Sequence, residues 1–394
     1  MQAEETDRVR QESSASRHLA FLFVSAFLAI GNFAALMSVV PLWAAHGGAG
    51  SGGVGATTGV TLGATVLTQL TMPWLFRLLT LRRMLAVGAF VLALATPAYA
   101  LTDALVPVLA VSAVRGAGFA CVVVAGVALA AEIAPPGRVA TSAGMFGVAA
   151  GLPNVLLLPA GVWLAQQWGF TPLFLAAAVV ALVAVPLALA LPETGGHATR
   201  QTSGHSHLGR RPLAAAGVFL TTTATFGTVA TFLPVALPAS PIPSLALLIL
   251  SAGAVVTRLV SGAVADRYGS GRLVVPCAVV CGLGAAGLAA TMDDGGPALV
   301  LAAAVFGLGL GAVQNDSFVV VLQHFGPGRS GAASTIWNIA YDGGMGLGPF
   351  VVGFGLALTG YAGVFVALAF ALIAAAAAGR MLGGRRMGMA EHTG

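Results

Sequence analysis

Four charged residues lie inside long apolar segments of this sequence, namely Arg115, Arg258, Asp316 and Asp342. A charge in the middle of a membrane helix costs about 2.5–3.5 kcal/mol even on lenient insertion scales, so such residues usually serve a function. A carboxyl group there can bind and release a proton, because burial favours its neutral form and a nearby arginine favours its charged form. An arginine can bind an anionic group or pair with a carboxylate. These residue types therefore indicate proton or ion handling within a membrane.

Asp342 is the residue that we expect to carry a proton. It stands about twelve residues into its apolar segment, which places it near the middle of a membrane at about 1.5 Å per residue. Arg115 and Arg258 are the available partners, and Arg115 lies at the better depth. Asp316 is the second candidate for proton coupling. The competing interpretation is that Asp342 is permanently paired with an arginine and only shapes the fold.

Other polar residues in the apolar segments could line a substrate cavity. Gln314 and Asn315 directly precede Asp316, and consecutive helical residues point about 100° apart, so the three cannot all face one cavity. We expect Gln314 or Asn315 to face the cavity and Asp316 to bond a neighbouring helix. Asn154 lies between two prolines, which suggests a bent helix beside the cavity.

The segment around Asp342 combines polar, aromatic and small residues. Asn338 and Asp342 are four residues apart and share a helix face, while Trp337 and Tyr341 form the adjacent stripe. Residues 343–349, GGMGLGP, follow at once; this run permits a bend, although close helix packing through glycine also explains it. The residues expected to line the substrate cavity are Arg115, Asn154, Gln314, Asn315, Trp337 and Asn338.

Composition indicates that membrane helices position these residues. Of 394 residues, 58% are hydrophobic and 8% are charged, about a third of the charged share of soluble domains. A soluble fold cannot bury that much apolar surface. The three cysteines lie in apolar segments without metal or disulfide spacing, and no phosphate-binding loop or nucleophile–base set is present. The sequence therefore predicts neither an enzyme, nor a cofactor, nor a metal site.

Twelve segments are long and apolar enough to cross a bilayer, which needs about 20 residues per helix. The expected spans are residues 19–40, 58–76, 84–100, 104–131, 139–165, 172–191, 213–235, 244–265, 273–291, 297–322, 331–358 and 361–382.

The arginines predict the orientation of these spans. All eighteen basic residues are arginine, and all but Arg115 and Arg258 lie in the tails or in alternate loops. Cytoplasmic loops carry the excess of positive charge, so we expect both termini in the cytoplasm and the protein in the plasma membrane. The same distribution explains the net charge of +5 without a nucleic-acid partner.

The chain divides into two similar halves. Residues 192–212 form one long polar loop, and a shift of 190 or 191 residues aligns loops and helices of the two halves. Arg77 then meets Arg267, for example, and Gly118 meets Gly309. We therefore expect an N-terminal six-helix bundle at 1–191, a linker at 192–212 and a C-terminal six-helix bundle at 213–394.

Residues 262–272, GAVADRYGSGR, join two of the expected spans and are called the signature loop below. The pattern formed by Gly262, Asp266, Arg267, Gly269 and Arg272 resembles the signature loop of the major facilitator superfamily. A serine replaces the basic residue that usually follows the second glycine. In the N-terminal half the matching loop is mostly lost.

The resemblance covers essentially the whole chain and has consequences for fold and function. It implies an all-α fold of twelve transmembrane helices in two pseudo-symmetric six-helix bundles, which rock about a midplane site. Resemblance to drug and metabolite efflux members favours secondary active export of a small organic solute in exchange for protons, by a monomer. An importer of the same fold and a non-transporting membrane sensor remain as alternatives.

Two contacts are expected at the cytoplasmic edge. The resemblance implies that Asp266 faces the helix start near Arg138, where partial positive charge favours a carboxylate, so that the signature loop acts as a conformational latch. We also expect an ion pair between Arg77, which follows the second span, and Glu132, which lies at the end of the fourth span.

Overall fold

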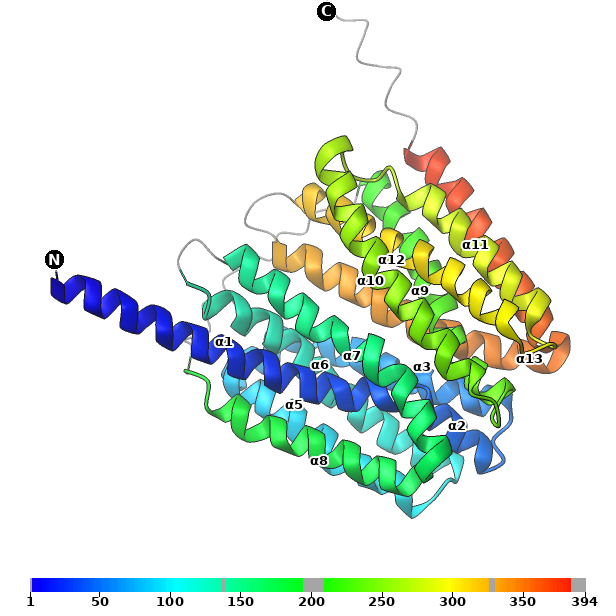
Figure 1. Cartoon of the computed structure of the whole chain (residues 1–394), viewed down its shortest axis with the longest axis horizontal. Coiled ribbons are helices and arrows are strands. Elements are labelled where there is room, and N and C mark those ends of the chain that lie inside the picture. Colours follow the sequence, from blue (N-terminus) through cyan, green and yellow to red (C-terminus); the bar gives the residue numbers. More distant parts are fainter. Residues whose placement is uncertain (1, 136–138, 194–208, 326–329, 384–394) are drawn as a thin grey trace, which may run out of the picture. The chain divides into compact units, whose positions relative to one another are not determined.

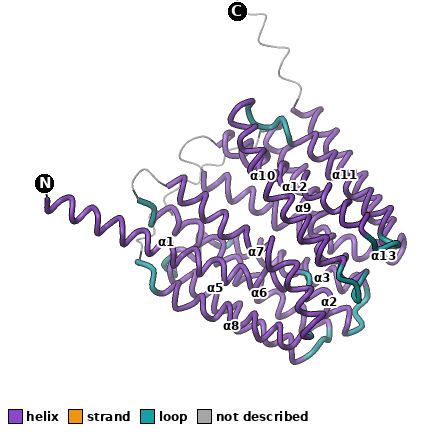
Figure 2. Tube along the Cα trace, in the orientation of Figure 1, coloured by secondary structure: helices purple, strands orange, loops and turns teal. Residues whose placement is uncertain are grey.

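The computed structural model describes residues 2–135, 139–193, 209–325 and 330–383. Within these ranges the regular elements are helices and no strand occurs (Figure 1, Figure 2). The helices are α1 (Gln2–Met37), α2 (Val39–His46), α3 (Ser51–Leu70), α4 (Met72–Leu78), α5 (Leu81–Ala95), the 3-10 helix η1 (Thr96–Leu101), α6 (Leu105–Glu132), α7 (Val139–Trp168), α8 (Phe170–Leu189), α9 (Arg210–Ala236), α10 (Ile242–Tyr268), α11 (Val274–Thr291), α12 (Pro297–Phe325) and α13 (Ser330–Gly383).

The expected twelve spans are present as helices. Ten helical stretches in the described ranges are long and apolar enough to cross a membrane. The last of them, Ala333–Met381, contains two of the expected spans, joined at Gly360, whose φ of 68° interrupts the helical backbone. The second expected span corresponds to α3, which has 20 residues but is rich in glycine and threonine, and it brings the total in the described ranges to twelve. The all-α prediction is therefore confirmed.

Contacts divide the chain into two compact units. The first unit comprises Met1–Trp43 and Gly63–Arg200, and the second comprises Ala44–Leu62 and Gln201–Gly394. The division falls inside α3, so the first part of this helix packs with the second unit. The boundaries expected for the two halves and their linker remain a prediction.

Small residues explain how the first part of α3 packs in the second unit. A side chain on Gly55 would collide with the backbone of Pro349, and one on Gly59 would lie 2.8 Å from Phe350. The hydroxyl of Thr58 also lies 2.8 Å from the hydroxyl of Thr231 on α9. Glycines four residues apart allow this close backbone approach.

In the first unit, α5 lies beside both α6 and α8, and α1 lies beside α7 (Figure 1). Gly88 on α5 and Gly118 on α6 face each other so closely that a side chain on either would contact the other's carbonyl oxygen. The second unit repeats this pairing between α11 and α12, where Gly309 meets the backbone of Cys277 and Cys281. Gly118 and Gly309 are related by the 191-residue repeat, so the same packing recurs in both halves.

The glycine run of α13 serves helix packing. The helix continues through residues 343–349. Gly344 packs against Thr223 and Leu220 of α9, and Gly348 packs against Ala224. The close-packing interpretation therefore accounts for Gly344 and Gly348, whereas Gly343 faces open space, and the break in α13 lies further on at Gly360.

Candidate substrate and coupling site

Helix α10 extends about one turn beyond the expected end of its span at residue 265, so the first part of the signature loop is helical. Helix α10 continues to Tyr268, so Gly262, Asp266 and Arg267 belong to its last two turns. Gly269 follows with a φ of 89° and Gly271 has a φ of 84°. Residues with side chains rarely adopt this left-handed region, so both glycines allow the sharp turn into α11.

Asp316 fixes this turn from α12. Its side chain is 1% exposed. One carboxylate oxygen accepts the backbone N–H of Gly271 at 2.7 Å, and the other accepts those of Leu273 and Val274 at 2.8 and 3.1 Å. Leu273 is the N-cap residue of α11 and Val274 is its first residue, and N–H groups at this position have no partner within the helix, whereas Gly271 lies in the preceding turn. Asp316 therefore caps α11, and its negative charge also matches the positive end of the helix dipole.

Two further contacts hold the same turn within the second unit. The hydroxyl of Ser270 donates to the side-chain oxygen of Gln323 on α12 at 2.5 Å, and Arg211 of α9 donates to the carbonyl oxygen of Ser270 at 2.6 Å. Ser270, which stands where the signature loop usually has a basic residue, thus connects the turn to α12.

The charged residues of the signature loop are solvent-exposed. Asp266, Arg267 and Arg272 all lie on the surface, and the guanidinium of Arg267 lies 5.4 Å from the ring of Tyr268. Arg138, the expected neighbour of Asp266, lies outside the described residues. The latch therefore remains a prediction.

Arg115 is buried among neutral groups of the first unit. Its guanidinium, 2% exposed, donates to the side-chain oxygen of Asn32 on α1 at 3.1 Å and to the hydroxyl of Tyr99 at 3.5 Å. It also lies 5.9 and 5.5 Å from the ring centres of Phe33 and Tyr99. The described residues of this unit offer it no carboxylate partner, and its Nε atom has no acceptor. Neutral acceptors and aromatic faces therefore stabilise this charge.

Arg258 has a different environment in the second unit. The side chain is partly exposed on α10. No described residue forms a hydrogen bond or an ion pair with its guanidinium group. The phenol of Tyr341 on α13 lies within electrostatic range. Arg258 is thus a charged residue of a membrane helix, and its guanidinium N–H groups have no acceptor among the described residues.

Trp337 and Tyr341 stack in an aromatic cluster between α13 and α9. Their ring centres are 5.7 Å apart with an interplanar angle of 13°. Trp337 also stacks on Phe219 at 4.9 Å and donates its indole N–H to the hydroxyl of Ser317 at 3.3 Å. The expected aromatic stripe therefore exists, and its rings are partly exposed.

Of the remaining expected cavity and coupling residues, Asp342 and Asn338 lie one turn apart on α13, and Asn154 lies on α7 of the first unit. Asp342 is 5% exposed and follows Tyr341 on α13. Asn338 is partly exposed and donates to Ser334 one turn before it at 3.3 Å. Asn154 is partly exposed on α7, which remains helical through both of its prolines. A pairing of Asp342 with Arg115 would join residues of different units and remains a prediction.

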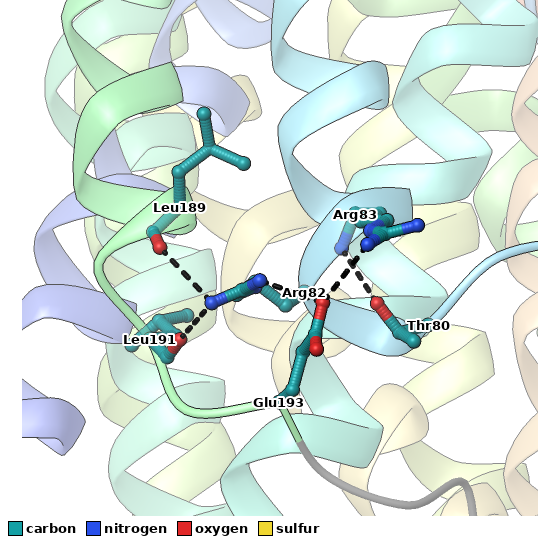
Figure 3. A network of polar contacts seen from close by, with 6 residues as sticks. All are labelled: Thr80, Arg82, Arg83, Leu189, Leu191 and Glu193. Atoms are coloured by element: carbon teal, nitrogen blue, oxygen red, sulfur yellow. Dashed lines mark hydrogen bonds and ion pairs between the residues drawn. The ribbon is translucent and has the colours of Figure 1, made fainter.

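At the start of α5 the structure shows a charged network that the sequence did not indicate (Figure 3). Glu193 lies 2.6 Å from Arg82 and 3.3 Å from Arg83, and Arg82 also donates to the carbonyl oxygen of Leu191 at 3.2 Å. Leu191 follows the end of α8, so the network connects α5 to α8.

The predicted pair of Arg77 and Glu132 is not among the described ion pairs. Arg77 lies in the last turn of α4 and Glu132 ends α6. Glu132 has another contact, and the pairing remains a prediction.

Comparison with known proteins agrees with this architecture. The model of the Major Facilitator Superfamily matches residues 22–349 and, in an overlapping match, residues 243–389. A search of curated proteins gives no match.

Three solved structures illustrate the likeness. The nucleoside transporter NupG is 14% identical with a TM-score of 0.74, covering 93% of this chain and 99% of that one. A bacterial homologue of the human lysosomal transporter Spinster is 13% identical with a TM-score of 0.73, covering 93% and 96%. The xylose transporter XylE from E. coli is 14% identical with a TM-score of 0.72, covering 93% and 97%. At these identities the likeness concerns the fold, and the family match shows that the chain belongs to the major facilitator superfamily.

Proposed function

We propose that this chain is a secondary active transporter that exports a small organic solute in exchange for protons. Membership of the superfamily supports the carrier class and alternating access, and it argues against an enzyme. Asp342 is proposed to bind the coupling proton. The observation that carries this choice is the helix cap made by Asp316: its carboxylate accepts three backbone N–H groups of the turn into α11, which indicates a structural role and makes Asp342 the better candidate for coupling.

The proton step needs a carboxyl group whose surroundings differ between two states of the cycle. Asp342 is buried in the first span of α13, where a change of neighbouring charge alters its proton affinity strongly. A proton taken up in one state is then released in the other, and an arginine that approaches in only one state provides the switch.

The test is transport into liposomes that contain the purified protein, with a pH difference across the membrane. Asp342→Asn is expected to abolish uphill accumulation while solute exchange between the two sides continues, because the uncharged amide permits both conformations. The exposed Asp294→Asn serves as a matched control and keeps the gradient response. Uphill transport by Asp342→Asn with an unchanged pH dependence would remove Asp342 from the proposal and return attention to Asp316.

The direction of solute transport is tested separately. Export predicts accumulation of solute in inverted membrane vesicles, whereas accumulation in right-side-out vesicles supports the importer alternative. Equal solute distribution with and without the protein, over a broad solute panel, supports a membrane sensor. We further propose a plasma-membrane location with both termini in the cytoplasm. The test introduces cysteines into the N- and C-terminal tails of the protein and measures their labelling in intact cells.

A further inference from the structure

Three polar side chains of the second unit have hydrogen-bonding capacity that the described protein does not use. They are Arg258 on α10 and Gln314 and Asn315 on α12, and all three residues are partly exposed. The side-chain nitrogen of Asn315 is buried without an acceptor. Neither Gln314 nor Arg258 forms a side-chain hydrogen bond with a described residue. Unused donors at membrane depth are costly, which indicates that something else binds them.

The packing of α10 on α12 places these three side chains together. Residues 254, 258 and 262 are spaced four apart and form one face of α10. Ala254 is in backbone contact with Gly311, and a Cβ atom added to Gly262 would lie 3.8 Å from the side-chain nitrogen of Asn315. Arg258 lies between these two contacts on the same face. It therefore faces the turn of α12 that carries Gln314 and Asn315.

The aromatic cluster adjoins this turn. Trp337 contacts α12 through Ser317 and lies 5.3 Å from the ring of Phe318, one turn after Gln314. Tyr341 packs with the core cluster that contains Val313 and lies within electrostatic range of Arg258. A positive group, two amides and two stacked rings thus occur together within a single unit.

From this juxtaposition we propose that the transported solute is a planar aromatic carboxylate. Arg258 binds the carboxylate, because its guanidinium presents paired donors that match two oxygens. Gln314 and Asn315 donate to the same group or to a ring substituent. Trp337 and Tyr341 contact the aromatic part, for which partly exposed rings provide a stacking surface. The inference rests on the proposed function in one respect, namely that the chain binds a small solute.

The chemistry of the site argues against other solute classes. A cationic solute would be repelled by Arg258, which forms no ion pair with a described acid. A sugar would leave the guanidinium unneutralised. An aliphatic acid would bind Arg258 but gain little from the rings.

The experiment measures binding of four probes to the purified full-length protein by equilibrium dialysis, without a pH gradient. The probes are naphthoate, naphthamide, naphthylmethylammonium and cyclohexanecarboxylate. Naphthoate is expected to bind most tightly. Arg258→Gln is expected to weaken naphthoate binding roughly tenfold or more, because a charge-assisted bond is lost, and to leave naphthamide binding unchanged. Arg258→Lys retains part of the preference for the acid.

Matched variants separate these effects from unfolding. Arg380→Gln removes an exposed arginine of the same unit and is expected to change nothing. Trp337→Leu is expected to reduce the preference for naphthoate over cyclohexanecarboxylate, whereas Trp337→Phe keeps a ring and retains it. A folded Arg258→Gln protein that still prefers naphthoate over naphthamide overturns the proposal, as does tighter binding of the ammonium probe by the unaltered protein. Because no gradient is present, failure of proton-driven export leaves this result unaffected.

Discussion

The cap that Asp316 provides for α11 can be tested by removing it. In Asp316→Ala the N–H groups of Gly271, Leu273 and Val274 lose their acceptor, and the carboxylate is 1% exposed, so water does not readily replace it. A buried donor left without a partner costs about 1–3 kcal/mol. Allowing for relaxation, we expect a loss of about 3–5 kcal/mol. Asp316→Asn retains one acceptor oxygen and should lose roughly half of this.

The assay is the thermal midpoint of unfolding of the purified protein in detergent. At 2–4 °C per kcal/mol for units of this size, Asp316→Ala should lower the midpoint by roughly 6 °C or more. Cys277 provides a local reading, because its backbone N–H bonds to Leu273 in the first turn of α11. Loosening of this turn should speed its reaction with a membrane-permeant maleimide, measured with Cys121 replaced by serine.

The control for the cap is Asp294→Ala, which removes an exposed acid near the other end of α11. It should alter neither the thermal midpoint nor the labelling of Cys277. An Asp316→Ala protein with an unaltered midpoint and unaltered labelling would show that the three hydrogen bonds do not hold α11. The cap also predicts that Asp316→Asn retains the pH dependence of transport.

Three other changes have defined outcomes. Gly344→Ala should lower the thermal midpoint of unfolding by an amount equivalent to about 1–3 kcal/mol, because the new methyl group meets Thr223. The control is Gly343→Ala, whose methyl group faces open space and should leave the midpoint unchanged. Equal effects of the two substitutions would refute the packing argument. Asp266→Asn should bias the protein toward the inward-open state, and normal accessibility of cysteine probes from the cytoplasm would contradict the latch. Exchanging Arg77 and Glu132 should restore any loss of stability seen in the single variants. An exposed ion pair contributes only about 0–1 kcal/mol to stability, so a thermal shift in a single variant that corresponds to more than this would also argue against simple pairing.

The helices could be predicted because bilayer thickness sets a length that apolar segments must meet. The second span shows where this criterion of length and hydropathy fails. It was expected to begin at residue 58, whereas α3 begins at Ser51. Residues 51–58, SGGVGATT, are small and polar, so hydropathy does not mark them. Within this segment Gly52 packs against Phe354 and Gly55 against Pro349, about 300 residues further along the chain, and no local pattern reveals such contacts.

Site residues could be predicted by type but not by partner. Asp316 was expected both as a structural group and as a second proton site, and its role depends on backbone N–H groups 42 to 45 residues away. Backbone donors have no signature in the sequence. The contacts of Arg211, Gln323 and Glu193 were not predicted, because surface polar residues are common and only tertiary contacts distinguish these three.

The two intramembrane arginines show how partners decide the role of identical side chains. Asn32, which holds Arg115, lies 83 residues away, and Tyr99 and Phe33 complete a shell that leaves Arg115 2% exposed. A guanidinium so enclosed has little access for a solute and acts mainly on its own unit. The guanidinium of Arg258 forms no hydrogen bond with a described residue, and we infer from the packing of α10 on α12 that it faces Gln314 and Asn315, whose side chains are likewise without a described partner. An anion is therefore more readily bound at Arg258, although depth in the membrane alone favoured Arg115.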